Sequence, residues 1–357
     1  MDEAAPARNY IVHGAGAVGS VVAARLATAG ADVSLVARGA HLEALAARGL
    51  RVEGLTEGVF DLPAVGDAHE LPIDGGAAGG GAAGDGAAGN RAAGTVVVLA
   101  MKTQDTFAAV RAHADLYRCL PVVCFQNGVS NEEWLTDQGF CAYGAMVRIG
   151  AFVDRPGVVC HTAGRLALLG RWPGGVDPLC RAVVDDLARG GLDAAVETDI
   201  RAVKWGKLVI NLVNAYLALA DLSVQDSLHD PDVRSFMADV EQEAADVTEA
   251  AGITVSIDGE TGLRGRIARL RRPAARVLRT GGAWSGVSYA STWQDLKAGR
   301  PTVEVDHFNG RIVELGEQHG IATPLNRVLR ERCTDAAARG LGPGTETEAS
   351  IRAAAAG

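Results

Sequence analysis

Residues 10–19 read YIVHGAGAVG, and this stretch decides the fold of the first half of the chain. Residues 10–13 are typical of a buried strand, and the three glycines that follow fit the pattern GxGxxG. Beyond them, apolar residues recur at helical spacing up to Gly30, which stands where a helix C-cap belongs. A glycine turn between a strand and a helix is typical of a dinucleotide-binding βαβ unit. The cofactor candidates in this turn are Gly14, Ala15, Gly16, Ala17, Val18 and Gly19.

Strand and helix patterns alternate along the residues that follow. Strands are predicted at 33–36, 95–101 and 121–125, with a short helix at 41–48. This alternation predicts an α/β fold, a Rossmann domain with a doubly wound, mostly parallel sheet, over residues 8–198.

Helical patterns replace the strand patterns from about residue 199. They run through residue 217, then over 233–251 and 303–319. We therefore expect a mainly α-helical C-terminal domain over residues 199–335. Two segments are expected to be flexible: the Gly/Ala-rich insertion at 74–94, and the tail at 336–357.

Composition and charge exclude several classes of protein. The net charge of −9 argues against binding to nucleic acid or to an anionic membrane, because both attract basic surfaces. The six cysteines form no CxxC pair, and we expect them to be reduced. The chain has no secretory signal pattern and no apolar run of about 20 residues. These features predict a cytoplasmic protein with no membrane or nucleic-acid partner.

The residue after the second predicted strand bears on the choice of cofactor. An enzyme that uses NAD places Asp or Glu about 20 residues after the glycine turn, where the carboxylate binds the ribose. This chain has Ala37-Arg38, and its nearest acid, Asp32, lies at the opposite end of the strand. A guanidinium at Arg38 can pair with a 2′-phosphate, so the sequence favours NADPH/NADP+. The alternative for Arg38 is a solvated loop arginine.

Four further segments follow in order, and together with the glycine turn they resemble the ketopantoate reductase family. They are LAMKTQDT (99–106), FQNG (125–128), KWGKLVINLVN (204–214) and STWQDLKAGRPTVEVDHFNG (291–310). The resemblance implies a Rossmann domain that binds NADPH and a helical domain that closes over the cleft. It also implies reduction of a 2-keto acid to a 2-hydroxy acid.

The resemblance also implies roles for single residues. Lys207 corresponds to the catalytic lysine. When hydride reaches a carbonyl carbon, negative charge develops on the oxygen, and a lysine can stabilise that charge and donate a proton. The implied substrate-binding residues are Asn211, Asn214 and Ser291. The implied residues of the cofactor site are Lys102 and Asn127 at the nicotinamide end and Glu304 at the nicotinamide ribose.

Helical spacing supports this site independently of the family. Lys207, Asn211 and Asn214 stand at i, i+4 and i+7, which on a regular helix places them within an arc of roughly 60°. Because their neighbours are largely apolar, this polar face must meet either a ligand cleft or buried polar partners. Lys204 is a rival cation, and we expect it near the surface.

Two departures from the family pattern concern the substrate and ribose side. Ala215 stands eight residues after Lys207, where the family typically has its second asparagine, and Asn214 comes one position earlier. Val303 separates Thr302 from Glu304, a one-residue insertion in the usual Thr-Glu pair. Both point to a divergent branch whose natural substrate need not be ketopantoate.

The default reaction is therefore reduction of ketopantoate to pantoate. One alternative is a reductase of the same fold that acts on an imine or a specialised carbonyl. Another is a protein that senses NADPH without chemistry, although this leaves Lys207 and the asparagines unexplained. By analogy with other two-domain dehydrogenases, a homodimer through the helical domain is expected.

Two other patterns carry weaker predictions. Seven arginines between Arg264 and Arg279 form either an attractor for an anionic substrate or, as we favour, a solvated helix face held by acidic neighbours. The eight histidines show no HExxH motif and no i, i+4 pair, so no catalytic metal is expected.

Overall fold

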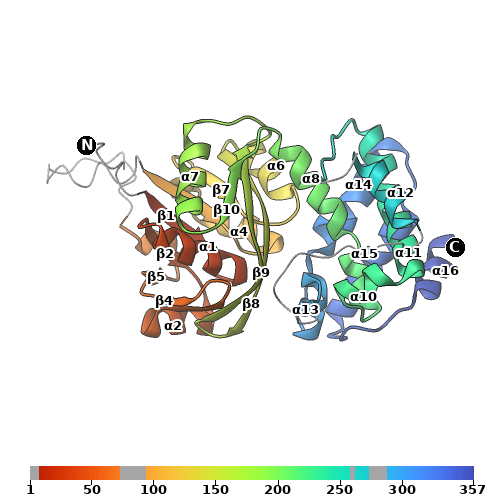
Figure 1. The fold of residues 1–357 in the computed structure, drawn as a ribbon, viewed down its shortest axis with the longest axis horizontal. Helices are drawn as coiled ribbons and strands as arrows, with labels where there is room; N and C mark the ends of the chain where they lie inside the picture. Colours follow the sequence, from red (N-terminus) through yellow and green to blue (C-terminus); the bar gives the residue numbers. More distant parts are fainter. Residues whose placement is uncertain (1–7, 73–93, 258–261, 273–287) are drawn as a thin grey trace, which may run out of the picture. The chain divides into compact units, whose positions relative to one another are not determined.

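The computed structural model describes residues 8–72, 94–257, 262–272 and 288–357. The chain divides into two compact units (Figure 1). Unit 1 comprises residues 1–126 and 130–201, and unit 2 comprises residues 127–129 and 202–357. The predicted Gly/Ala insertion lies outside the described residues except for Gly94.

Unit 1 is built on a ten-stranded sheet whose order is β4-β3-β9-β8-β7-β6-β1-β2-β5, with β10 beside β9. All pairings are parallel except β3 with β4 and β8 with β9. The strands are β1 (Asn9–His13), β2 (Asp32–Val36), β3 (Leu50–Gly54), β4 (Gly58–Phe60), β5 (Ala64–Val65), β6 (Thr95–Leu99), β7 (Pro121–Cys124), β8 (Cys141–Arg155), β9 (Val158–Arg171) and β10 (Asp193–Val196).

Helices cover this sheet. Helix α1 packs against β8, β9 and α7, and α6 packs against β8. The helices of unit 1 are α1 (Ala17–Thr28), α2 (Gly39–Arg48), η1 (Ala68–Glu70), α4 (Thr103–Ala112), α5 (Ala114–Tyr117), α6 (Ser130–Asp137) and α7 (Pro178–Arg189). This arrangement confirms the predicted Rossmann fold with its mostly parallel sheet.

Local sequence explains why the central strands form. β6 is a run of β-branched and aliphatic residues, TVVVL, and all five are buried because a central parallel strand is covered on both faces. The β8–β9 hairpin was not among the predicted strands. Its outer part alternates polar and apolar residues and is partly exposed, so it gives a weaker apolar signal than β6.

Among the described residues of unit 2 there are helices and no strand, as predicted for the C-terminal domain. Helix α11 is central and packs against α12, α14 and α15. Trp205, Phe236 and Phe308 lie in the core of this unit. Its helices are α8 (Ile200–Asn211), α9 (Asn214–Leu219), α10 (Val224–His229), α11 (Pro231–Ala250), α12 (Gly262–Leu270), α13 (Ser291–Lys297), η2 (Glu304–His307), α14 (Asn309–His319), α15 (Pro324–Ala338) and α16 (Glu348–Ala356).

The prediction of a flexible tail at 336–357 is wrong. Helix α15 runs to Ala338, and α16 packs on α15 through a fully buried Ile351. Arg352 forms an ion pair of 2.9 Å with Asp239 of α11. An alanine-rich segment carries little local signal, and its order comes from this tertiary packing.

None of the helices in the described part of the chain combines the length and the apolar character that crossing a bilayer requires.

Candidate active site

The three glycines of the turn between β1 and α1 meet three different surroundings. Gly14 has φ +99°, and a Cβ there would lie 2.3 Å from the backbone nitrogen of Met101. At Gly19 a Cβ would lie 2.2 Å from the carbonyl oxygen of Gly14. A Cβ on Gly16, in contrast, would meet nothing within 4 Å. The first and third glycines are therefore needed for close packing, whereas the second faces open space where a ligand can approach the backbone.

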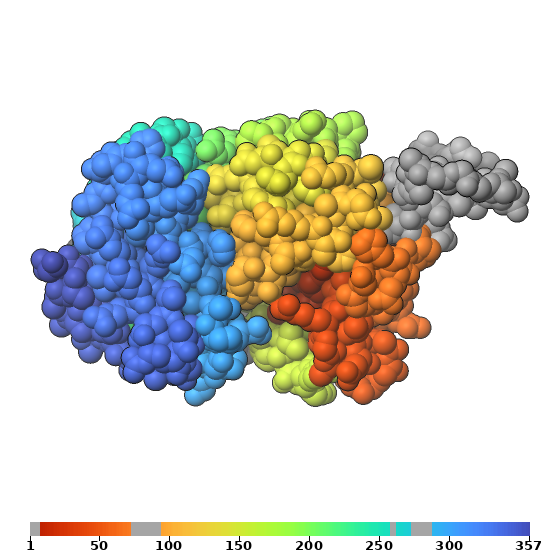
Figure 2. Space-filling model, turned by 180° about the vertical axis from the view of Figure 1, so that it is seen from behind, coloured from red at the N-terminus to blue at the C-terminus, as the bar shows by residue number. Residues whose placement is uncertain are grey.

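The turn is anchored at the end of β2 and presents a helix N-terminus. The carbonyl oxygen of Val36 accepts from the N–H groups of Gly14 and Ala15, at 3.0 and 3.3 Å. The N-cap of α1, Gly16, makes no side-chain cap, and the first turn of the helix carries no acid. Such an N-terminus attracts anions. Figure 2 shows a hollow on the surface of unit 1, with dark red atoms from the first described part of the chain at its floor.

Arg38 lies where a 2′-phosphate contact is expected, just beyond β2 and at the N-cap of α2. Its side chain is 84% exposed, and its guanidinium pairs with the carboxylate of Asp105, in the first turn of α4, at 2.7 Å. Asp32 is the first residue of β2 and therefore lies at the other end of the strand. This ion pair thus joins the segment after β2 to the first turn of α4, the helix that follows β6.

Lys102 is the N-cap of α4 and follows Met101, whose backbone borders Gly14. Gln126, at the end of β7, holds this loop: its amide donates to the carbonyl of Met101 at 2.9 Å and to Thr106 Oγ1 at 2.5 Å. Gln126 was not a sequence candidate. Its place directly before Asn127, at the carboxyl end of a parallel strand, is the signal that marks it.

His41 is a second residue that the sequence analysis did not single out. It lies in the first turn of α2, and its Nδ1 accepts from the N–H of Gly157 at 3.1 Å. Burial lowers the pKa of His41, and a contact with the backbone of Ala15 partly offsets this effect. His41 therefore contacts the glycine turn as a neutral imidazole. Its position three residues after Arg38 is the signal for it.

In unit 2, Lys207 and Asn211 lie one turn apart on α8, and both are partly exposed. Of the three residues between them on the helix, Leu208 and Val209 are completely buried, whereas Ile210 is partly exposed. The expectation that Lys204 lies near the surface is wrong, since it is only 3% exposed. Lys204 stands one turn before Leu208, on the face of α8 that packs into the unit.

The helix that carries these residues is interrupted, which corrects the prediction of one helix through residue 217. α8 ends at Asn211 and α9 begins at Asn214. The side-chain amide of Asn309 donates to the carbonyl of Leu212 at 3.0 Å, so the break has a buried partner. The arc calculated for a continuous helix therefore describes Lys207 and Asn211 but does not extend to Asn214. Asn214 is partly exposed, and Ala215 is buried.

The remaining candidates of unit 2 lie on two short elements and one loop. Ser291 is the first residue of α13, which packs against α9. Glu304 opens η2 and is buried. Asn127 belongs to the segment 127–129, which clusters with unit 2, and a Cβ on Gly128 would lie 3.6 Å from the carbonyl oxygen of His307, the last residue of η2. The fold thus brings the loop that carries Asn127 close to the element that carries Glu304.

The arginine-rich segment is held by acids where it is described. Arg264 forms ion pairs with Asp246 and Glu249. Arg266 forms a bidentate ion pair with the buried carboxylate of Glu241. Arg271 pairs with Asp239. These contacts favour the solvated, acid-paired helix face over an anion attractor. Pro273, Arg276, Arg279 and the Gly281-Gly282 pair lie outside the described residues.

A Rossmann sheet with an open glycine turn, combined with a helical unit that presents a lysine and asparagines, defines a two-unit chain of the dehydrogenase and reductase type. Family models described as "Ketopantoate reductase PanE/ApbA" and "Ketopantoate reductase PanE/ApbA C terminal" match residues 10–174 and 199–333. The chain is 30% identical over 342 residues to the 2-dehydropantoate 2-reductase of Mesorhizobium japonicum, covering 88% of this chain and 93% of that protein. It belongs to the ketopantoate reductase family and is an oxidoreductase.

Solved structures show the same fold. A PanE/ApbA family ketopantoate reductase from Ralstonia eutropha JMP134 is 27% identical, with a TM-score of 0.73, over 93% of this chain and 99% of that chain. A D-mandelate dehydrogenase, solved with NADH and anilino(oxo)acetate, has a TM-score of 0.73 at 21% identity, over 93% of this chain and 98% of that one. This second likeness concerns the fold alone.

Proposed function

We propose that the chain reduces a 2-keto acid to the 2-hydroxy acid with hydride from NADPH, and that ketopantoate is the default substrate. One observation carries the proposal: Lys207 and Asn211 are partly exposed on α8, and Leu208 and Val209 between them are completely buried. Polar side chains that are partly exposed beside buried neighbours can contact a ligand. The family membership supports the same reaction.

The chemistry gives each residue a task. Bound NADPH, which the glycine turn and Arg38 would hold, would supply hydride to the carbonyl carbon and would be released as NADP+, and the C=O π pair would move to the oxygen. The ammonium of Lys207 stabilises the developing negative charge and transfers a proton to the oxygen, which completes the hydroxyl. Asn211, Asn214 and Ser291 bind the substrate, while Glu304 and Asn127 bind the nicotinamide end of the cofactor.

Arg38 favours NADPH over NADH as the cofactor. The glycine turn suits the pyrophosphate of any dinucleotide, so the choice depends on the group that meets the 2′ position. Arg38 follows β2 with its side chain largely exposed, and Asp32, the nearest acid in the sequence, stands at the opposite end of that strand. A 2′-phosphate on Arg38 would replace the carboxylate of Asp105 as the partner of the guanidinium.

A second candidate is a related substrate, an imine or a specialised carbonyl. The break between α8 and α9 favours this second candidate. Ala215 is buried, and Asn214 is the first residue of a separate helix, α9. The chain's substrate pocket therefore differs from one with the second asparagine eight residues after the lysine. Turnover of a panel of 2-keto acids and cyclic imines, measured by NADPH absorbance, separates the two candidates.

The test of the leading proposal is Lys207→Ala. Removal of a group that stabilises transition-state charge typically lowers kcat by about 10² or more. We expect that loss, with the Kd for NADPH little changed. The matched control is Arg201→Ala, which removes an exposed cation from the start of the same helix and should leave kcat unaltered. Turnover of Lys207→Ala within about threefold of wild type would contradict the catalytic role.

We further propose that the chain acts in the cytoplasm. The six cysteines, all of them in the described part of the chain, are not joined by disulfides, and three of them are buried, as is usual for thiols in a reducing compartment. A homodimer through the helical unit stays a prediction, which sedimentation of the purified chain tests.

A further inference from the structure

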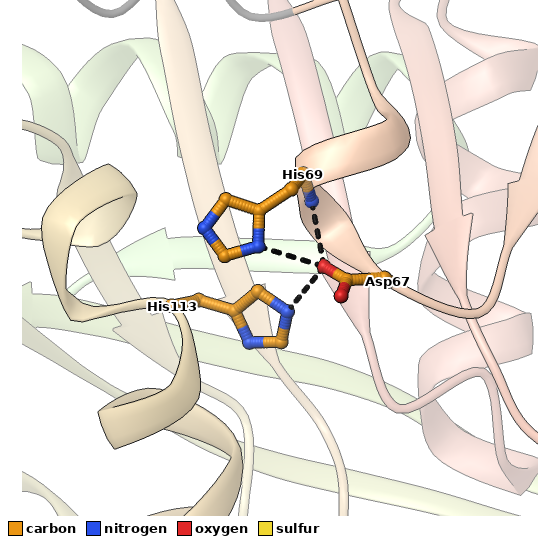
Figure 3. A group of neighbouring side chains, drawn as sticks. All are labelled: Asp67, His69 and His113. Atoms are coloured by element: carbon orange, nitrogen blue, oxygen red, sulfur yellow. Dashed lines mark hydrogen bonds and ion pairs between the residues drawn. The ribbon is translucent and has the colours of Figure 1, made fainter.

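Asp67, His69 and His113 form a cluster in unit 1 that the proposed reaction does not use (Figure 3). Asp67 and His69 belong to the turn after β5, whereas His113 stands between α4 and α5. Asp67 and His113 are 46 positions apart in the chain, so no sequence spacing reveals the group. The cluster exists because the connections after two parallel strands meet at one edge of the sheet.

The two imidazoles each direct a ring nitrogen at Oδ1 of Asp67 (Figure 3). Asp67 Oδ1 lies 2.8 Å from His69 Nδ1 and 3.0 Å from His113 Nε2, and the three candidate ligand atoms lie within 4.8 Å of one another. Local structure holds them there. Asp67 caps η1 by accepting from the N–H of His69 at 2.9 Å, and the ring of His113 is buried and stacked between His69 and Tyr117.

The other nitrogen of each imidazole faces an oxygen. His113 Nδ1 lies 2.8 Å from the carbonyl of Ala109, and His69 Nε2 lies 3.2 Å from the carboxylate of Asp115. Since a carbonyl oxygen only accepts, the neutral ring of His113 carries its proton on Nδ1, and the Nε2 lone pair faces Asp67 and His69. The N–H of Ala68, 3.3 Å from His113 Nε2, also points at that lone pair. Metal-binding histidines are oriented in this way, by an oxygen on the second nitrogen.

Hydrogen bonds hold the two imidazoles on Asp67 in this structure. A divalent metal can take the place of the bridging protons, because its ligands bind in their deprotonated forms. Zn²⁺ bonds to imidazole nitrogen and carboxylate oxygen at about 2.0–2.2 Å, which places tetrahedral ligand atoms about 3.3 Å apart. The two separations from Asp67, 2.8 and 3.0 Å, need to open by a few tenths of an ångström, and the two histidine nitrogens, which lie within 4.8 Å of each other, need to settle at the same spacing.

We propose that Asp67, His69 and His113 form a binding site for a divalent transition metal of the Zn²⁺ type, with water in the fourth position. Asp115 and the Ala109 carbonyl orient the two imidazoles. The metal would have a structural role, because His113 packs against His13 with ring centroids 5.2 Å apart, and His13 bonds to Tyr117 at 2.8 Å. His13 ends β1 and immediately precedes the glycine turn. The site would therefore brace the base of the dinucleotide turn.

The test uses the full chain, stripped with chelator and titrated with ZnCl₂ alone at neutral pH by calorimetry. We expect one saturable site, proton release that depends on the buffer, and a melting temperature raised by at least about 3 °C at saturation. His69→Ala, in an exposed turn, should weaken Zn²⁺ binding at least about tenfold. His319→Ala removes an exposed histidine from unit 2 and should bind as wild type does.

Two further measurements test whether the metal lies on Asp67, His69 and His113 or elsewhere on the chain. Asp67→Asn preserves the cap of η1, since Asn is a good N-cap, yet should also weaken the metal site. Co²⁺ in place of Zn²⁺ should give a tetrahedral spectrum without a thiolate charge-transfer band. A thiolate band would move the metal to the exposed Cys119 or Cys141 and overturn the proposal. Equal affinity of wild type and His69→Ala, or no binding at all, would overturn it as well.

Discussion

At the scale of single residues, Gly16 is a position where a substitution should weaken cofactor binding without lowering the stability of the fold. It has φ −76°, and a Cβ there meets nothing within 4 Å, so alanine fits without strain. We expect Gly16→Ala to leave the free energy of unfolding unchanged or raised by about 0.5–1 kcal/mol. If a pyrophosphate approaches this backbone, the new methyl should weaken NADPH binding at least about tenfold. Urea unfolding and fluorescence titration measure the two quantities.

Gly14→Ala is the comparison for this prediction. Its left-handed φ of +99° and the backbone of Met101 at 2.3 Å exclude a side chain, so this variant should lose stability before any question of cofactor arises. If Gly16→Ala binds NADPH as tightly as wild type, the dinucleotide does not lie on this turn.

Arg38 is the residue that should decide between NADPH and NADH. Removing its guanidinium by Arg38→Ala should raise the KM for NADPH about tenfold or more, because a charge-assisted bond to the 2′-phosphate is lost. The KM for NADH should change little. Steady-state kinetics with both cofactors measure this, and Arg51→Ala, which removes another exposed arginine of unit 1 paired with Glu53, is the control. An equal rise for both cofactors would refute the assignment.

At the scale of elements, helix α7 depends on its N-cap. Asp177 accepts from the N–H of Cys180 at 2.9 Å and from the hydroxyl of Tyr143 at 2.7 Å. Although burial opposes it, these hydrogen bonds lower the pKa of Asp177. A depressed folded pKa means that the carboxylate stabilises the fold above its unfolded pKa of about 4, and that this stabilisation is lost as the pH falls below it.

Asp177→Ala should therefore cost about 1 kcal/mol or more at neutral pH, since the cap is lost and the Tyr143 hydroxyl loses its acceptor. The difference from wild type should shrink below about pH 4. Urea unfolding at several pH values tests both statements. Asp185→Ala, on the exposed face of the same helix, should fall within about 0.5 kcal/mol of wild type at every pH.

At the scale of the whole molecule, the C-terminal helix α16 shows how a weakly patterned segment becomes part of a core. Ile351 is fully buried there. Ile351→Ala should destabilise the chain by about 2–5 kcal/mol, which thermal unfolding detects. Ala353→Ser, on the exposed side of α16, should change stability by less than about 0.5 kcal/mol. A similar melting temperature for both variants would mean that α16 does not support unit 2.

Whether a feature could be predicted from the sequence depends on how far apart its interacting residues lie in the chain. The glycine turn, the buried strands and the Lys207–Asn211 spacing were predictable, because each depends on neighbours within one or two turns of chain. The break at residues 212–213 was not, since Asn309, which bonds to the carbonyl of Leu212, comes almost a hundred residues later. Lys204 was misplaced for the same reason: helical spacing fixes relative directions but not which face another element will cover.

The amino-acid sequence by itself determined the alternation of strands and helices, the dinucleotide turn and the polar residues of α8. Local steric and hydrophobic preferences act over a few residues and are written into the order of side chains. Only the tertiary structure decided that α16 is ordered, that Lys204 is buried, and that Asp67, His69 and His113 meet. These depend on contacts between distant segments, which form only when hydrophobic burial brings the elements together.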